Sequence, residues 1–148
     1  DRTVDVDDVV VGESADDLLA RIAEKLRLNR DVVNEVFSID DGTLTLLVPS
    51  SRLEKAKAGA TRQIALLVAG GRQAAGIDDE WTSIEEIREV CNDFGKYDAP
   101  NFSHAINSLD QFCSFKGKGQ KREVRLNRQG FEEVAQLVTK LSNSQGVA

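Results

Sequence analysis

Residues 99–126 read APNFSHAINSLDQFCSFKGKGQKREVRL, and this stretch decides the fold. Its first part has apolar residues at i, i+3, i+4 and i+7, the spacing of one face of a helix, which we expect over residues 99–110. The apolar positions are Phe102, Ala105, Ile106 and Leu109. Short or planar hydrogen-bonding groups occupy the opposite face of this helix: Asn101, His104, Asn107 and Ser108.

The second part of the stretch changes to a period of two, which is typical of strands. Inward and outward positions alternate over residues 112–116 and again over residues 123–126. Gly117 and Gly119 lie between the two runs and permit a turn. We therefore expect a β-hairpin with a basic tip directly after the helix. Its cationic residues are Lys116, Lys118, Lys121, Arg122 and Arg125.

Composition places the chain among ordinary globular proteins. The 148 residues suit one domain or two small ones that share a core, and 41% hydrophobic with 30% charged residues argues against overall disorder. The longest apolar run, Ile64–Ala69, is too short to cross a membrane. The acidic start does not resemble a secretory signal, and the chain contains no Met. We expect a cytoplasmic domain of a larger protein, with no membrane association.

Two cysteines, Cys91 and Cys113, argue against a disulfide framework and favour a reducing compartment. Both fall on apolar faces of predicted elements, and we expect buried thiols that act as small hydrophobic groups. A zinc site formed by these cysteines and His104 lacks a fourth ligand and the close pair spacing of metal sites. We therefore predict no metal and no cofactor.

The net charge of −6 is unevenly distributed. Residues 1–80 carry 16 acidic and 10 basic side chains, whereas residues 81–148 carry 9 of each. Residues 116–128 contain six basic side chains and one acidic side chain, Glu123. A local excess of positive charge on a hairpin can hold a phosphate backbone, while the acidic remainder would repel it and so steer its orientation.

The N-terminal part, residues 1–49, is predicted to be a small α/β module. Residues 1–12 form either an edge strand or a tether. Ser14 is expected to cap a helix over residues 15–28, and Asn29 a short helix over residues 30–36. Asp41-Gly42 separates two β-prone runs, a strong hairpin signal because a tight turn needs positive φ. In that hairpin Phe37 and Ile39 can face the residues Leu44, Leu46 and Val48.

The remaining part, residues 50–148, is predicted to begin with a long helix capped by Ser50 or Ser51. Residues 50–76 include this helix, which is apolar on nearly all sides and is therefore expected to be a spine shared by both parts of the chain. Gly70-Gly71 is expected either to pack closely or to begin the helix end. A capped helix over residues 83–94 follows, and a closing helix after Gly130 ends before a frayed segment, residues 143–148.

This order of elements resembles the winged helix-turn-helix superfamily. The resemblance covers residues 50–142 and depends on a helix, a brief strand, two further helices and a β-wing. The run VRLNRQGFEEVAQLVTKL resembles the ending of many bacterial members, with Leu126 closing the wing and Gly130 preceding the last helix. The fold class is therefore expected to be α+β and mostly helical, with the N-terminal module joined by the long helix to a winged helix-turn-helix.

The resemblance implies that the third helix enters the major groove of DNA and that the wing lies on the flanking backbone. The residues expected to face bases are Asn101, Ser103, His104, Asn107 and Ser108. The residues expected to contact phosphates are Lys116, Lys118, Lys121 and Arg122, with Arg125 beside them. Asparagine suits adenine, since it can donate to and accept from that edge at once.

Two features favour a different partner. The third helix carries no Arg or Lys, and the second helix is acidic on its outer side, at Glu85, Glu86, Glu89 and Asp93. The alternative function is therefore a protein-interaction or oligomerisation module, either with a partner or as a homodimer. RNA binding is a third option, although 5% aromatic residues leave few stacking surfaces. Only His104 could act as a general base near neutrality, so we predict no enzyme and no small-molecule substrate.

Overall fold

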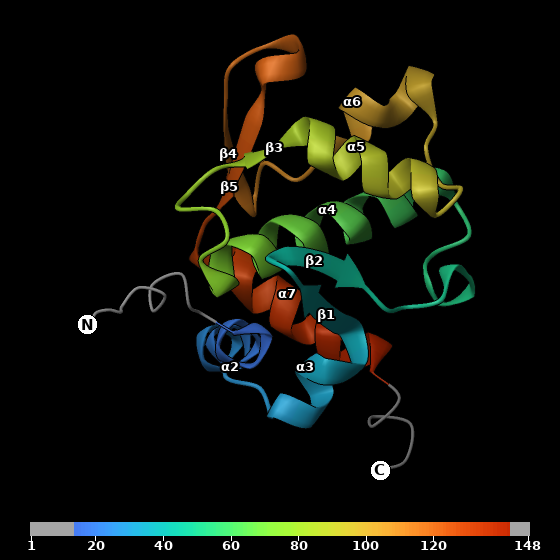
Figure 1. Cartoon of the computed structure of the whole chain (residues 1–148). Coiled ribbons are helices and arrows are strands. Elements are labelled where there is room, and N and C mark those ends of the chain that lie inside the picture. Colours follow the sequence, from blue (N-terminus) through green and yellow to red (C-terminus); the bar gives the residue numbers. More distant parts are fainter. Residues whose placement is uncertain (1–13, 143–148) are drawn as a thin grey trace.

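The computed structural model describes residues 14–142, and within them the chain is an α+β fold dominated by helices. Figure 1 shows α4 (Lys57–Ala75) running through the middle of the molecule. One side of α4 carries α5 (Ile84–Asp93), α6 (Ala99–Asn107) and a three-stranded sheet. The other side carries α2 (Ala15–Leu26), α3 (Arg30–Val36), α7 (Arg128–Leu141) and a two-stranded hairpin. The predictions for residues 1–12 and 143–148 lie outside the described residues.

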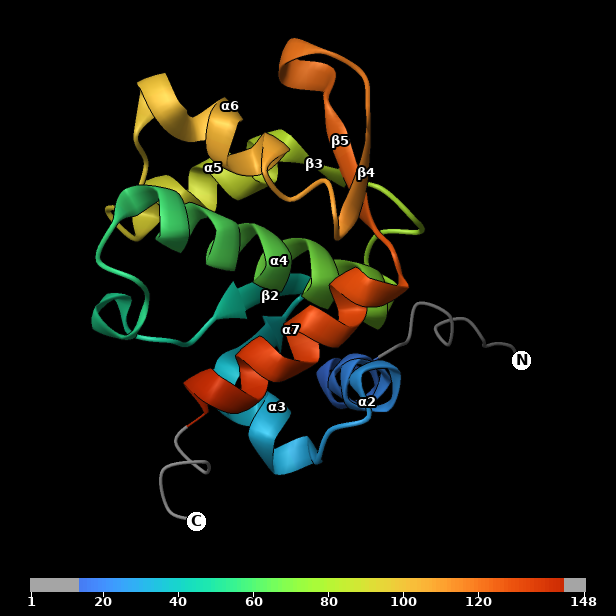
Figure 2. The same cartoon turned by 180° about the vertical axis from the view of Figure 1, so that it is seen from behind.

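One continuous hydrophobic core joins these two layers. Buried residues of α4 contact both layers, among them Ile64, Leu67 and Val68. The view from behind shows that α7 crosses back from the sheet to lie against α2, α3 and α4 (Figure 2). The helix is therefore covered on all sides, as its nearly continuous apolar sequence predicts.

The hairpin of the N-terminal layer has the predicted turn, and Phe37 and Ile39 lie opposite Leu46 and Leu44, whereas Val48 lies beyond the second strand. Strands β1 (Phe37–Asp40) and β2 (Thr43–Leu46) pair antiparallel, with Ile39 opposite Leu44. Asp41 and Gly42 have φ values of 57° and 77°, as a tight two-residue turn requires. Ser14 and Asn29 cap α2 and α3 through their side-chain oxygens, as predicted.

The long helix begins later than predicted. Ser50–Arg52 forms a 3₁₀ turn, a bent non-helical connection follows, and α4 starts only at Lys57. Leu53 is buried in the core, and the backbone N–H of Glu54 donates to Gln63 Oε1 at 2.8 Å. These two contacts hold the connection outside the helix, so the prediction of a helix from Ser50 or Ser51 is wrong.

Gly70 and Gly71 lie inside α4, where they allow close packing against two different elements. A Cβ at Gly70 would lie 2.8 Å from Val134 Cγ2 of α7, and one at Gly71 would lie 2.8 Å from Leu44 Cδ2. The helix continues to Ala75 and ends at Gly76, whose φ is 84°. Of the two roles predicted for the glycine pair, close packing is the one observed.

The three-stranded sheet has the order β3-β5-β4 and is antiparallel throughout. Its strands are β3 (Thr82–Ser83), β4 (Cys113–Lys116) and β5 (Glu123–Leu126), with Phe115 opposite Val124. The last helix starts before Gly130 rather than after it. Asn127 Oδ1 accepts from the Gly130 N–H at 2.8 Å, and this cap starts α7 at Arg128.

Candidate nucleic-acid interface

The amphipathic character predicted for residues 99–110 is present in α6 and the turn after it. Phe102, Ala105, Ile106 and Leu109 are buried, whereas the polar side is exposed to solvent. The exposed residues are Asn101, Ser103, His104, Asn107 and Ser108. The helix ends at Asn107 instead of residue 110 because the chain then turns sharply towards β4.

Three of these polar residues already hydrogen-bond within the protein. Asn101 Nδ2 donates to Asp98 Oδ2 at 2.9 Å, and Ser108 Oγ donates to the carbonyl of Ala105 at 2.6 Å. Asn107 Oδ1 accepts from the guanidinium of Arg122. The structure places Asp98 before the first helical residue, where its carboxylate orients Asn101 instead of capping a backbone N–H.

The tip of the β4–β5 hairpin is built by glycines at positive φ. Gly117 has φ 82° and Gly119 has φ 58°, and a 3₁₀ turn follows over Gly119–Lys121. A Cβ at Gly117 would lie 2.6 Å from the carbonyl oxygen of Lys121, so the two sides of the tip approach closely. Lys118 and Lys121 are exposed, and no carboxylate of residues 14–142 lies within 4.0 Å of either ammonium.

The outer face of the hairpin carries two cations that are already paired. Lys116 Nζ lies 3.6 Å from Glu123 Oε1, and Arg125 donates to Glu80 Oε1 at 3.1 Å. Both cations also lie over the ring of Trp81, at 4.6 Å and 4.9 Å from its centre. Trp81 therefore organises this face. Its distance in sequence from both cations hides this contact from periodicity.

Arg122 lies on the other side of the hairpin, towards α6. Its guanidinium is 4.6 Å above the centre of the Phe115 ring and donates to Asn107. The predicted site residues thus fall into three groups. Lys116 and Arg125 lie together on the outer face, Lys118 and Lys121 lie at the tip, and Arg122 joins the polar face of α6.

A side chain of α4 fixes the base of the hairpin. Gln73 Nε2 donates to the carbonyl of Val124 at 3.0 Å, and Gln73 Oε1 accepts from the N–H of Leu126 at 3.1 Å. The amide therefore pairs with β5 as a neighbouring strand would. Thr82 Oγ1, which is buried, accepts from Gln73 Nε2 at 3.0 Å and donates to Asp78 at 2.7 Å. This network orients the hairpin relative to the helices.

The acidic character of α5 is reduced by ion pairs. Glu85 pairs with Arg88, and Glu86 lies 3.7 Å from Arg72. Two hydrogen bonds from Arg72 to Asp78, at 2.8 Å and 3.0 Å, are the main reason that the pKa of Arg72 is raised. Glu89 and Asp93 remain exposed. The negative charge available to repel a polyanion is therefore smaller than the sequence of α5 indicates.

The cysteines lie in the core, as predicted. Both thiols are free and buried, and burial raises the pKa of Cys91 to about 11 and that of Cys113 to about 12. Within the described residues no cluster of three metal-ligating side chains occurs. No helix of residues 14–142 combines the length and apolar character that crossing a membrane requires.

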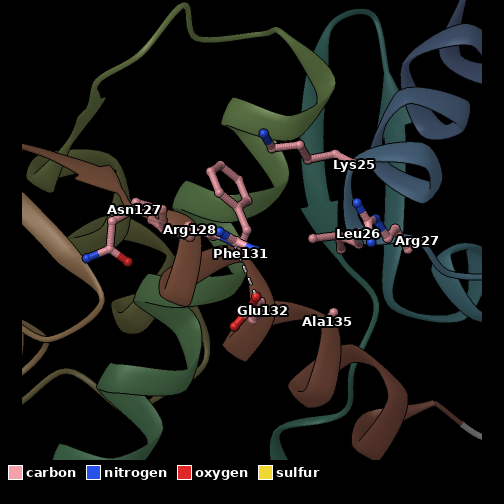
Figure 3. Close-up of a pocket in the computed structure, with 9 residues that line it drawn as sticks. Lys25, Leu26, Arg27, Asn127, Arg128, Phe131, Glu132 and Ala135 are labelled. Atoms are coloured by element: carbon pink, nitrogen blue, oxygen red, sulfur yellow. Dashed lines mark ion pairs between the residues drawn. The ribbon is translucent and has the colours of Figure 1, made fainter.

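A hollow of about 540 Å³ lies between the end of α2 and the start of α7 (Figure 3). Lys25 and Phe131 point towards each other there, with the ammonium 4.6 Å from the ring centre. Arg128 pairs with Glu132 at 3.7 Å. None of the predicted site residues lines this hollow, so it is a feature separate from α6 and the hairpin tip.

No family model, curated protein or solved structure matches the chain.

Proposed function

We propose that the protein binds duplex DNA through α6 and the β4–β5 hairpin, as a winged helix-turn-helix domain. The proposal depends on one observation, the position of two lysines that have no carboxylate partner in residues 14–142 beside an exposed, uncharged helix face. Lys118 and Lys121 supply attraction to phosphates, and the amide and hydroxyl groups of α6 can read base edges. The order α4, β3, α5, α6, β4, β5 follows the order that the resemblance implies.

The distribution of free charge supports this orientation. On the hairpin, Lys116 and Arg125 are paired with carboxylates, so the unpaired positive charge is concentrated at the tip. A phosphate backbone would therefore contact the tip first, while exposed carboxylates elsewhere repel it. Gly117 and Gly119 add no side chains of their own between the tip lysines, which permits close approach of a phosphate backbone.

The test compares two charge reversals of equal size. Lys118→Glu/Lys121→Glu reverses both tip charges, and Lys25→Glu/Arg27→Glu reverses two cations at the end of α2. In both views α2 and the hairpin lie at opposite ends of the molecule, with α4 between them (Figures 1 and 2). Affinity for a fluorescent duplex is measured at about 50 mM salt, where phosphate contacts contribute most.

We expect the tip variant to lose at least about 10-fold in affinity, and the α2 variant to lose much less. Circular dichroism establishes that both variants are folded. Equal losses in the two variants would show attraction by net charge alone and would contradict the proposed surface. An unchanged affinity in the tip variant would contradict the proposed attraction between the tip lysines and phosphates.

Protein interaction is the second candidate function, and it is favoured by a different observation. Leu47, directly after β2, is 49% exposed although it is large and apolar. Glu89 and Asp93 form an exposed acidic surface on α5. A molar mass that rises with protein concentration in light scattering, and that falls again in a Leu47→Ser variant, would support this function.

A further inference from the structure

We propose that Arg122 and Asn107 together recognise a guanine base. This inference rests on the proposed binding of duplex DNA. The helix α6 contains no Arg or Lys of its own. Arg122 of the hairpin reaches across to its last residue and donates a hydrogen bond to it. The hairpin thereby supplies the guanidinium that the helix lacks.

The chemistry of the two groups fixes the orientation of the amide. A guanidinium has only donors, so the atom of Asn107 that faces Arg122 is the oxygen Oδ1. The Nδ2 group, with two N–H donors, consequently points away from Arg122. The combined surface is rich in amide and guanidinium N–H donors, and one of the two lone pairs of Oδ1 is already held by Arg122.

A surface dominated by donors discriminates between purines. In the major groove guanine presents two adjacent acceptors, N7 and O6, whereas adenine presents the acceptor N7 beside an amino donor. The pairing of asparagine with adenine needs both the amide oxygen and the amide nitrogen. Because Arg122 holds one lone pair of Asn107 Oδ1 and places guanidinium donors beside it, the amide edge that would pair with adenine is already partly engaged, and the pair favours guanine.

Arg122 is held in place before any ligand binds. Its carbonyl accepts from the N–H of Ile84 at 2.9 Å, and its own N–H donates to the carbonyl of Gly119 at 3.2 Å. Its guanidinium lies 4.6 Å above the centre of the Phe115 ring. Little side-chain entropy remains to be lost on binding, which is the condition for a selective contact. Arg122 is half-buried and Asn107 is exposed, so a base edge can reach both.

The competing role for Arg122 is a phosphate contact, and Arg122→Lys separates the two roles. Lysine keeps the charge that attracts phosphate but lacks the planar fork that reads guanine. Arg125→Gln is a matched control, because it removes an arginine of the same hairpin that faces Trp81 instead of α6.

The experiment selects binding sequences from a duplex pool with a randomised centre, using the intact chain. Each guanine of the preferred duplex is then replaced by 7-deazaguanine, which lacks the N7 acceptor, or by adenine. For the parent and Arg125→Gln we expect one guanine whose replacement costs about 10-fold in affinity. For Arg122→Lys we expect the same replacement to change affinity less than about 2-fold, with the salt dependence retained.

The outcomes separate this inference from the proposed function. If the parent binds no duplex, both are overturned. If the parent binds duplexes without preferring guanine, or if Arg122→Lys keeps the full preference, only the guanine reader is overturned. Loss of preference in Asn107→Ala as well as in Arg122→Lys would support the joint role of the two residues.

Discussion

Replacement of Gln73 by leucine should destabilise the protein far more than its half-buried position on α4 indicates. The amide makes three hydrogen bonds, to Val124, Leu126 and Thr82, at 3.0 to 3.1 Å. Leucine has a similar volume, so the change removes these bonds without opening a cavity. Each bond contributes about 1 kcal/mol net, and the backbone groups of β5 that are left unpaired add a further penalty. We expect the free energy of unfolding to fall by about 3–4 kcal/mol.

The matched control is Gln63→Leu on the same helix. Gln63 is more buried than Gln73, but its side chain accepts one hydrogen bond, from the N–H of Glu54 at 2.8 Å. The same substitution there should cost only about 1 kcal/mol. Urea unfolding followed by far-UV circular dichroism gives both free energies from the transition midpoint and slope.

Hydrogen exchange locates the effect. In Gln73→Leu the amide of Leu126 should exchange faster than in the parent, because its acceptor is gone. The N–H of Leu47, which donates to Val36 on the other side of α4, should exchange through local opening at the same rate as in the parent. A Gln73→Leu variant no less stable than Gln63→Leu would refute the strand-like role of this amide.

Three further predictions concern the core. Gly71→Ala gains about 1 kcal/mol of helix propensity but forces a Cβ to 2.8 Å from Leu44 and 2.9 Å from Phe37. Because overpacking costs about 1–3 kcal/mol, we expect urea unfolding to show a net loss of stability of up to about 2 kcal/mol. A stabilised variant would contradict the close packing. Because burial raises the pKa of Cys91 to about 11 and that of Cys113 to about 12, both thiols should resist alkylation by iodoacetamide at pH 8 in the native state. The raised pKa values also make stability depend on pH, because the thiols ionise more easily in the unfolded chain than in the fold. Their contribution to stability is fully present below pH 9.0, the ordinary thiol pKa, and is lost as the pH rises towards about 11 to 12. The loss is up to about 1.4 kcal/mol per pH unit for each thiol. In a Cys91→Ala/Cys113→Ala variant the free energy of unfolding should decline less steeply at alkaline pH. An equally steep decline would contradict the raised pKa values of the two thiols.

Local sequence signals predicted the elements well. The spacing of Phe102, Ala105 and Ile106 indicated the buried face of α6, and Asp41-Gly42 indicated the β1–β2 turn. These features depend on neighbours within a few residues, so periodicity and turn chemistry are sufficient to find them. The exposure of every residue predicted to face bases follows from the same periodicity.

Contacts between distant residues could not be predicted in this way. The start of α4 depends on the buried position of Leu53, and the contact between Glu54 and Gln63 forms only once that helix exists. Gln73 has a polar side chain of the kind that usually faces solvent, yet this side chain hydrogen-bonds to β5, more than 50 residues later in the sequence. The link between Arg122 and Asn107 requires the placement of the hairpin beside α6. Tertiary geometry alone decides such contacts.

The salt dependence of duplex binding tests the central claim most directly. Lys118 and Lys121 are the tip lysines without a carboxylate partner in residues 14–142, so log K against log salt should have a slope of about −2. Lys118→Glu/Lys121→Glu should make the slope shallower by about 2. No duplex binding at low salt, or a slope that is the same in parent and variant, would contradict the account.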